Sequence, residues 1–183
     1  MLSRLASLEH RRESRILCRL ERASRDEVQR YADETLAAML LWCKYRVPYY
    51  RRFLRVIPDR HIEQSAARVL GDLPILDKQL LHEYFHELTA QGRSGWRIRL
   101  NATGGSTGEP AQFLQDSAYR RWNRALTAHF ECWTGCGLGD ARVALWGMPR
   151  DLQDSASALV RARNRFLNRT MLDAYGMSEA AMD

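Results

Sequence analysis

The chain has 183 residues and a formal net charge of +6, and its composition is 45% hydrophobic and 27% charged. This balance excludes a compositionally disordered chain, and the length fits one domain. The longest apolar run, residues 36–43, is too short to cross a bilayer, so we expect no membrane span. Four cysteines at irregular spacing, behind an N-terminus without the apolar segment of a secretory signal, predict reduced thiols and a cytoplasmic protein.

The first half of the chain is predicted to be helical. Residues 1–23 are expected to form a basic helical arm that is rich in arginine and loosely amphipathic. Ser24 fits a helix N-cap, because Glu27 stands three residues later and completes a capping box. Apolar residues at helical spacing follow. That helix should end before Pro48, since the residue preceding a proline disfavours the α conformation.

A further helix and two strands are predicted in the middle of the chain. Residues 73–76 are predicted to be a short extended segment that leads into a helix. Asp77 is expected to cap that helix, which runs to about Leu88. Residues 96–102 and 111–115 are predicted strands. The glycine-rich segment between them would therefore join two strands, and not a strand and a helix.

The rest of the chain mixes helix and strand. A helix is predicted to begin at Asp116 or Ser117 and to end at Gly135 or Gly137.

Arg142–Trp146 is predicted to be a short buried strand, followed by a turn at residues 147–150 and a basic helix over about 155–167. Together these elements predict an α/β fold whose first half is dominated by helices. Ser178 has the features of a helix start only five residues before Asp183, and for this reason we expect the sequence to be cut short.

The segment from Asn101 to Pro110 carries the strongest chemical signal. Its glycines let the backbone turn sharply and approach a ligand, and consecutive N–H groups in such a turn form a nest for an anion such as phosphate. It is not a Walker A loop, because Gly108 is followed by Glu109 and not by Lys-Ser/Thr. The alternative is a hairpin connection made of turn residues, with no ligand. A phosphate grip would use backbone N–H groups and the side chains of Thr103, Ser106 and Thr107.

Five segments, taken together, resemble a known family. They are a Pro-Tyr-Tyr-Arg element, a Leu-Pro-Ile-Leu element, the glycine-rich loop, a Gly-Asp-x-Arg-Val strand start and a Trp-Gly-x-Pro-Arg-Asp-Leu segment: Val47–Arg51, Leu73–Lys78, Ala102–Pro110, Gly139–Val143 and Trp146–Leu152. In this order they resemble the N-terminal part of adenylate-forming enzymes of the phenylacetate–CoA ligase type. The likeness is strongest to the CapK-like branch found in capsular-polysaccharide gene clusters, and it runs from about residue 30 to the end.

The resemblance implies ATP-dependent activation of a small carboxylic acid. In that chemistry the carboxylate attacks the α-phosphate, pyrophosphate leaves, and the acyl-adenylate is passed on, often to coenzyme A. The partners implied are a nucleotide and a small acid, with ATP and Mg²⁺ as cofactors, and nucleic acid is not among them. By position in the family's motif, the residues expected to contact phosphate are Thr103, Gly104, Gly105, Ser106, Thr107 and Gly108.

The chain also departs from the family pattern. Residues 24–183 correspond to part of the ATP-binding domain, without the ribose-binding region or the mobile C-terminal domain of longer members. Tyr175–Glu179 could be read as an acidic, Mg²⁺-binding motif, but its distance from the loop is too short for the family's order. Residues 172–179 match a helix start of the CapK-like branch better. We therefore expect a ligase fragment with little or no activity alone, and self-association through an exposed sheet edge.

Two other functions compete with the ligase hypothesis. His82-Glu83-x-x-His86 matches the zinc-peptidase signature, in which both histidines bind zinc and the glutamate acts as a base. On a helical projection the two histidines lie opposite the apolar arc, so we expect surface histidines instead. The other alternative is a non-catalytic remnant or interaction protein that keeps the fold but not the chemistry.

Three more groups of residues are given structural interpretations. His129, Cys132 and Cys136 could supply part of a zinc site, but small buried thiols near a helix end are expected. Four aromatic residues could line an acyl pocket, but core positions are expected for them: Trp122, Phe130, Trp133 and Trp146. Four arginines are expected to form a solvated basic face: Arg161, Arg163, Arg165 and Arg169.

Overall fold

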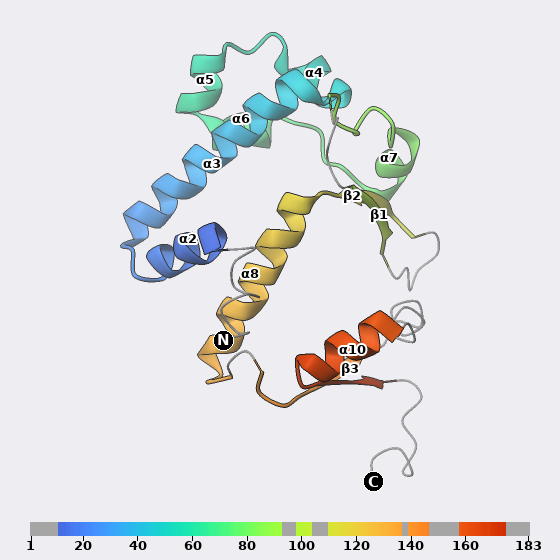
Figure 1. Cartoon of the computed structure of the whole chain (residues 1–183). Helices are drawn as coiled ribbons and strands as arrows, with labels where there is room; N and C mark the ends of the chain where they lie inside the picture. The colour runs from blue at the N-terminus through green and yellow to red at the C-terminus, as the bar shows by residue number, and fades with distance from the viewer. Residues whose placement is uncertain (1–10, 93–97, 104–109, 137–138, 147–157, 175–183) are drawn as a thin grey trace. The chain divides into compact units, whose positions relative to one another are not determined.

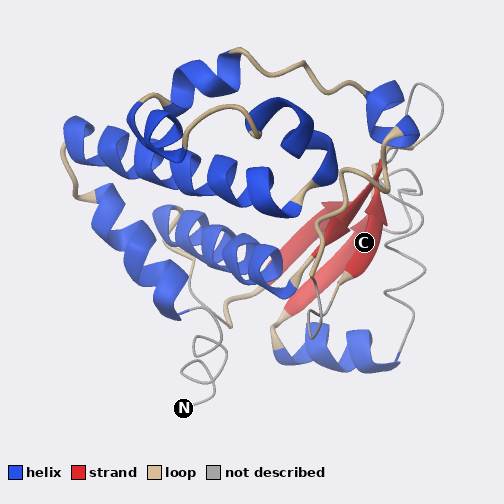
Figure 2. Cartoon of the chain, turned by 90° about the horizontal axis from the view of Figure 1, so that it is seen from above, coloured by secondary structure: helices blue, strands red, loops and turns tan. Residues whose placement is uncertain are grey.

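The computed structural model describes residues 11–92, 98–103, 110–136, 139–146 and 158–174. The chain divides into a helical unit, residues 12–123, and a C-terminal unit, residues 124–183 together with 1–11. Figure 1 labels the helices and strands, and Figure 2 shows that helices predominate in the described residues. Their strands form two separate pairs. The predicted mixture of helix and strand is confirmed at this level.

Helix α3, Arg25–Arg46, begins and ends as predicted from local sequence. Ser24 is its N-cap, and the capping box is complete, because the Ser24 N–H donates to the Glu27 carboxylate at 2.8 Å and Ser24 Oγ accepts from the Glu27 N–H. Acidic residues in the first turn and basic residues in the last turn complement the helix dipole. Val47 then adopts an extended conformation, as a residue before proline prefers.

Pro48 starts helix α4, Pro48–Leu54, where its missing N–H costs nothing because the first helical N–H groups have no partner within the helix. Two further short helices follow, α5 (Asp59–Gln64) and α6 (Ala66–Gly71). All three pack on α3. The shared core consists of six buried residues: Ala37, Leu40, Leu54, Ile62, Ala66 and Val69. Each short helix is too short to be stable alone, so burial against α3 is what holds it.

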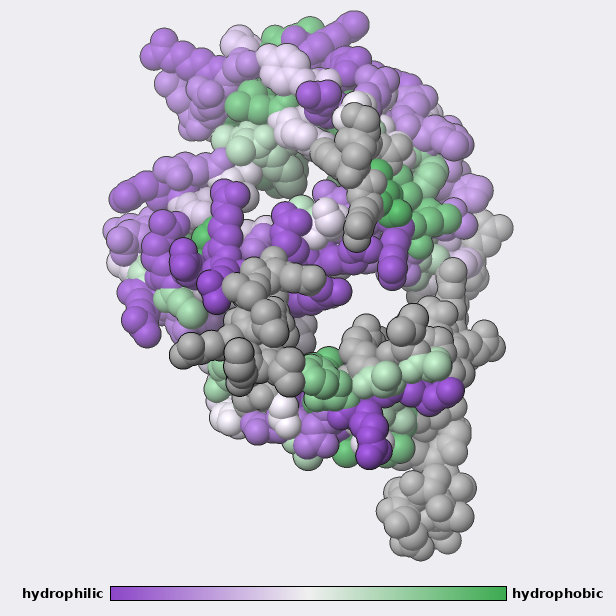
Figure 3. Space-filling view, viewed as in Figure 1, coloured by the Kyte–Doolittle hydropathy of each residue, from purple (hydrophilic) through white to green (hydrophobic). Residues whose placement is uncertain are grey.

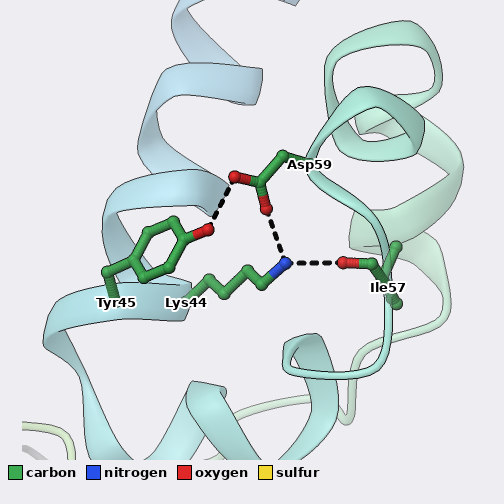
Figure 4. A network of polar contacts seen from close by, with 4 residues as sticks. All are labelled: Lys44, Tyr45, Ile57 and Asp59. Carbon is green, nitrogen blue, oxygen red and sulfur yellow. Dashed lines mark hydrogen bonds and ion pairs between the residues drawn. The ribbon is translucent and has the colours of Figure 1, made fainter.

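A polar clasp also ties α3 to the start of α5 (Figure 4). Lys44 Nζ donates to the Ile57 carbonyl and to Asp59 Oδ1, both at 2.6 Å, and Tyr45 Oη donates to Asp59 Oδ2 at 2.6 Å. The Lys44 side chain is only 11% exposed, so its charge depends on these acceptors. The hydrogen bond from Lys44, and then that from Tyr45, lower the pKa of Asp59 below its ordinary value of 3.8.

Helix α7, Lys78–Glu83, confirms the predicted Asp77 cap, because Asp77 Oδ1 accepts from the Leu80 N–H at 2.8 Å. The predicted end at about Leu88 is wrong. Tyr84 leaves the helical conformation, and the chain continues in turns. The reason is tertiary, since the Tyr84 ring packs against the Tyr49 ring at 5.3 Å and the Glu87 carbonyl accepts from the Tyr49 N–H.

The β1–β2 hairpin and helix α2 complete the helical unit. Strands β1 (Arg99–Ala102) and β2 (Gln112–Gln115) pair antiparallel, which confirms the strand–loop–strand prediction. Helix α2, Arg11–Glu21, confirms a helix in the basic arm. Its buried Glu13 accepts from Arg121 Nε at 3.1 Å. Burial raises the pKa of Glu13, but hydrogen bonds and the Arg121 charge outweigh burial and lower it.

Helix α8, Ser117–Trp133, has the predicted ends. Asp116 Oδ1 accepts from the Tyr119 N–H at 2.7 Å at its start, and Gly135 takes the left-handed conformation just beyond its end. None of the described helices is long and apolar enough to span a membrane.

The C-terminal unit contains a β–α–β arrangement of β3 (Arg142–Trp146), α10 (Ala158–Phe166) and β4 (Arg169–Asp173). The two strands pair in parallel, with Arg142 opposite Arg169 and Leu145 opposite Leu172. Strand β4 was not predicted, and it contains Leu172 and Asp173, the first residues of the segment 172–179 that matched a helix start. Ser178, where that helix is expected to begin, lies outside the described residues. The left-handed Asn168 turns the chain from α10 into β4.

The prediction that β3 is buried is also wrong. Val143 is 66% exposed and Leu145 is 56% exposed. Parallel strands are usually covered on both faces, whereas these apolar side chains face solvent in the part of the chain that the structure describes. Self-association through a sheet edge stays a prediction. The predicted turn at 147–150 and the first residues of the predicted helix at 155–167 lie outside the described residues.

Leu54→Ala should destabilise the protein by about 2–5 kcal/mol, because a fully buried leucine would leave a cavity between α4 and α3. Urea unfolding followed by circular dichroism measures this change. Val56→Ala is the matched control at a residue that is 77% exposed, and it should change the free energy of unfolding by no more than about 0.5 kcal/mol. Equal effects of the two substitutions would contradict the assigned core.

Asp59→Asn should lower the melting temperature at pH 7. A carboxylate with a lowered pKa stabilises the fold above its unfolded-state value and loses that contribution as pH falls through the folded-state pKa, which here is below 3.8. The difference in melting temperature between wild type and Asp59→Asn should therefore shrink below that pH. The exposed Asp72→Asn is the control and should leave the melting temperature near wild type at pH 7. A difference that stays constant from pH 7 to pH 2 would contradict the clasp.

Candidate functional site

Two hydrogen bonds join the residues that flank the predicted phosphate loop. Beyond the last strand pair, Ala102 opposite Gln112, the Thr103 N–H donates to the Ala111 carbonyl at 2.9 Å, and Thr103 Oγ1 accepts from the Ala111 N–H at 3.0 Å. These two bonds form what we call the neck of the loop. The other predicted contacts lie outside the described residues: Gly104, Gly105, Ser106, Thr107 and Gly108.

Thr103 therefore has a role that the sequence did not suggest. Its hydroxyl oxygen accepts a bond from the opposite side of the hairpin, and a hydroxyl that accepts one bond still has a proton to donate. The residue is exposed, as a ligand contact must be. Thr103 can thus close the neck and donate to an anion at the same time. The signal that could have revealed the neck is the threonine's position directly after a strand and before the first loop glycine.

Beside the hairpin lies a cavity of about 370 Å³ within the helical unit. Its lining includes residues from two segments that carry the family resemblance and from the strand that follows a third. Tyr50 comes from the Val47–Arg51 element, Leu76 from the Leu73–Lys78 element, and Phe113 from the strand after the loop. Figure 3 shows hydrophobic surface in the region that Figure 1 labels α7 and β2. Segments far apart in the sequence thus share one apolar site.

Polar and aromatic contacts fix the wall around this cavity. Arg52 pairs with Glu87 and also lies over the Tyr84 ring, with its guanidinium carbon 5.6 Å from the ring centroid. The Tyr49 ring contacts both Tyr50 and Tyr84 at 5.3 Å. Burial, followed by the neighbouring Cys43 and Tyr49, raises the pKa of the Tyr50 hydroxyl. Tyr50 of the cavity wall is therefore part of a cluster of packed aromatic rings.

The zinc-peptidase signature does not form a site in the described residues. His82 and His86 are both exposed, as predicted, and α7 ends at Glu83, so the two histidines do not share one regular helix. Glu83 is bonded to the Tyr84 hydroxyl, which raises the pKa of Tyr84. No group of three metal-binding side chains occurs among the residues that the structure describes.

The interpretations of α8 need correction. Phe130 and Trp133 are 50% and 64% exposed, so their predicted core positions are wrong, and their rings pack on each other at 5.0 Å. Trp122 is half-buried, and nothing is described of the Trp146 side chain. None of these four residues is among the described lining of the cavity.

Cys132 is exposed and Cys136 half-buried, so the prediction of buried thiols is wrong for Cys132. The His129 ring contacts Phe130 and Trp133.

The predicted basic face is confirmed in part. Arg161 and Arg165 are exposed on α10, as expected for a solvated helix face. Arg169 lies in β4 and is half-buried, so it does not belong to that helix face. The Arg163 side chain lies outside the described residues.

Comparison with protein-family models, with curated proteins and with solved structures finds no match to this chain. The function must therefore be argued from the residues themselves.

Thr103→Val should speed hydrogen exchange at the Ala111 amide, because the exposed neck loses one hydrogen bond. A single bond contributes about 0.5–1.5 kcal/mol, so the rate should rise roughly 2–10-fold. Thr103→Ser, which keeps the hydroxyl, should restore protection. Thr35→Val removes a comparable exposed hydroxyl that donates to the Tyr31 carbonyl in α3, and it should leave the Ala111 amide unchanged. An unchanged Ala111 rate in Thr103→Val would show that the hydroxyl does not hold the neck.

Proposed function

We propose that the chain is part of a cytoplasmic ATP-dependent ligase that activates a small carboxylic acid, and that the loop from Thr103 to Gly108 grips the β- and γ-phosphates of ATP. The observation that carries the proposal is the neck. The loop contains three glycines and three hydroxyl side chains, and it connects two antiparallel strands. Hydrogen bonds between Thr103 and Ala111 join the two strands at the point where the loop begins. Holding both ends of the loop lowers the entropy that is lost when it closes around an anion.

The chemistry assigned to the loop is positioning and charge stabilisation. An oxygen of the acid attacks the α-phosphorus of ATP, the bond from that phosphorus to the pyrophosphate oxygen breaks, and an acyl-adenylate forms. Negative charge develops on the departing pyrophosphate, so N–H and O–H donors aimed at its phosphates favour the step. Mg²⁺ would neutralise further charge, and transfer of the acyl group to coenzyme A would complete the reaction.

The arrangement of the resembling segments gives further support. Tyr50, Leu76 and Phe113 belong to separate elements and line one cavity next to the hairpin. Tyr50 and Leu76 come from two of the resembling segments, and Phe113 follows the third, so these segments are neighbours in the fold as well as ordered in the sequence. The exposed His82 and His86 give the zinc-hydrolase alternative no comparable support.

Phosphorus NMR of Mg-ATP tests the grip. Adding the protein should broaden the β- and γ-phosphorus resonances more than the α resonance, and inorganic pyrophosphate should reverse the broadening while adenosine should not. Gly105→Ala should abolish the effect, because a Cβ in the loop keeps the phosphate from approaching the backbone. Acyl-adenylate formation by the chain alone is expected to be little or none.

Gly71→Ala is the matched control. Gly71 ends α6 at the surface, and a Cβ placed there meets no atom within 4 Å. This variant should broaden the ATP resonances as wild type does. Equal broadening by wild type and Gly105→Ala would remove the loop from the mechanism, and an absence of broadening at millimolar ATP would contradict the proposed function.

A further inference from the structure

The cavity beside the hairpin has the size of a ligand site. Its volume of about 370 Å³ lies in the range of small-molecule pockets, which is about 300–1,000 Å³. The cavity is open to solvent, since Trp42 and Tyr119, which line it, are 41% and 50% exposed. The described lining comes from α3, α4, the α7 region, the hairpin and the start of α8.

The apolar part of the lining is rich in aromatic rings. They include Trp42, Tyr50, Phe85, Phe113 and Tyr119, and leucines fill the space between them. Flat rings offer large contact areas to another flat molecule, and offset or edge-to-face packing adds to the gain from burial. The body of a matching ligand is therefore apolar and aromatic.

The polar part of the lining includes two side chains that can accept from a ligand, beside Gln112, Trp42 and the tyrosine hydroxyls, which can donate. The Thr89 hydroxyl already donates to the Phe85 carbonyl at 2.8 Å, which leaves its oxygen to accept. Asp116 Oδ1 accepts from the Tyr119 N–H, and a carboxylate has a second oxygen that can accept as well. Among the described lining residues Asp116 alone carries a charge, and that charge is negative. A ligand with a cationic donor group fits this wall, and one with a carboxylate does not.

We propose that this cavity binds a small aromatic amine, with the ring system among the aromatic side chains and the ammonium group at Asp116. The proposal does not depend on the phosphate loop or on acid activation. The proposed occupant is a small molecule, because the cavity has the size of a ligand site and Asp116, in its lining, carries the charge opposite to that of an ammonium group. A second copy of the chain or a segment of the chain itself as the occupant would appear in the test as a cavity that takes none of the probes.

Three probes with the same carbon skeleton test the charge preference. They are 2-naphthylmethylamine, 2-naphthylmethanol and 2-naphthoate, each titrated into the whole chain without nucleotide and followed by ligand-observed NMR and thermal shift. The amine should bind roughly tenfold more tightly than the alcohol, since a charge-assisted bond adds about 1.4 kcal/mol, and the carboxylate should bind most weakly.

Two variants locate the site. Asp116→Asn keeps a good N-cap for α8 and removes the charge, so it should abolish the preference of the amine over the alcohol. Ala90→Phe fills the cavity from its half-buried wall and should reduce binding of the amine and of the alcohol at least tenfold. Gly71→Ala, on the surface of α6, is the control and should bind as wild type does.

Three results would overturn the proposal. These are binding of the carboxylate as tight as that of the amine, an amine preference that survives in Asp116→Asn, and an absence of binding by all three probes at millimolar concentration. If Asp116→Asn fails to fold, Ala90→Phe still decides the location, because unchanged amine binding in that variant places the ligand elsewhere.

Discussion

Burial of one face of α3 is the constraint on which the helical unit depends. Leu40 and its neighbours on that face cover the short helices α4, α5 and α6, none of which could form alone. The end of α3 and the start of α4 then hold the next segment by backbone bonds. The Gln91 N–H donates to the Arg46 carbonyl at 2.7 Å, and the Tyr49 N–H donates to the Glu87 carbonyl at 3.1 Å. These bonds hold the chain against the end of α3 and the start of α4 as far as Gln91, ahead of the hairpin.

The sequence predicted those features that depend on a few neighbouring residues. The Ser24–Glu27 capping box, the break at Pro48 and the cap at Asp77 follow from local chemistry, and the structure confirms them. The early end of α7 could not be predicted in this way, because it depends on contacts of Tyr84 with a ring 35 positions earlier in the chain. The predictions of buried residues on α8 and β3 were wrong for a related reason. The spacing of apolar residues shows which of them share a face, but not whether another element covers that face.

The candidate site was predicted in part. The two strands and the loop between them were found, and the neck formed by Thr103 and Ala111 was not, because a side-chain bond across a hairpin depends on register. The cavity was not predicted either. Tyr50 and Phe113 are 63 positions apart, and nothing in their local sequence places them on one wall. The molecule thus offers two chemically different surfaces, a loop rich in donors for phosphate and a largely apolar cavity whose described lining carries one charge, the negative charge of Asp116.

The central claim is that the loop grips the phosphates of ATP, and hydrogen exchange with mass spectrometry tests it most directly. The peptide covering residues 98–115 is compared with and without Mg-ATP, and with AMP, which lacks the β- and γ-phosphates. Our account predicts slower exchange in this peptide with ATP, no slowing with AMP, and little change in α3 in either case. Equal protection by ATP and AMP, or protection that appears only outside residues 98–115, would contradict it.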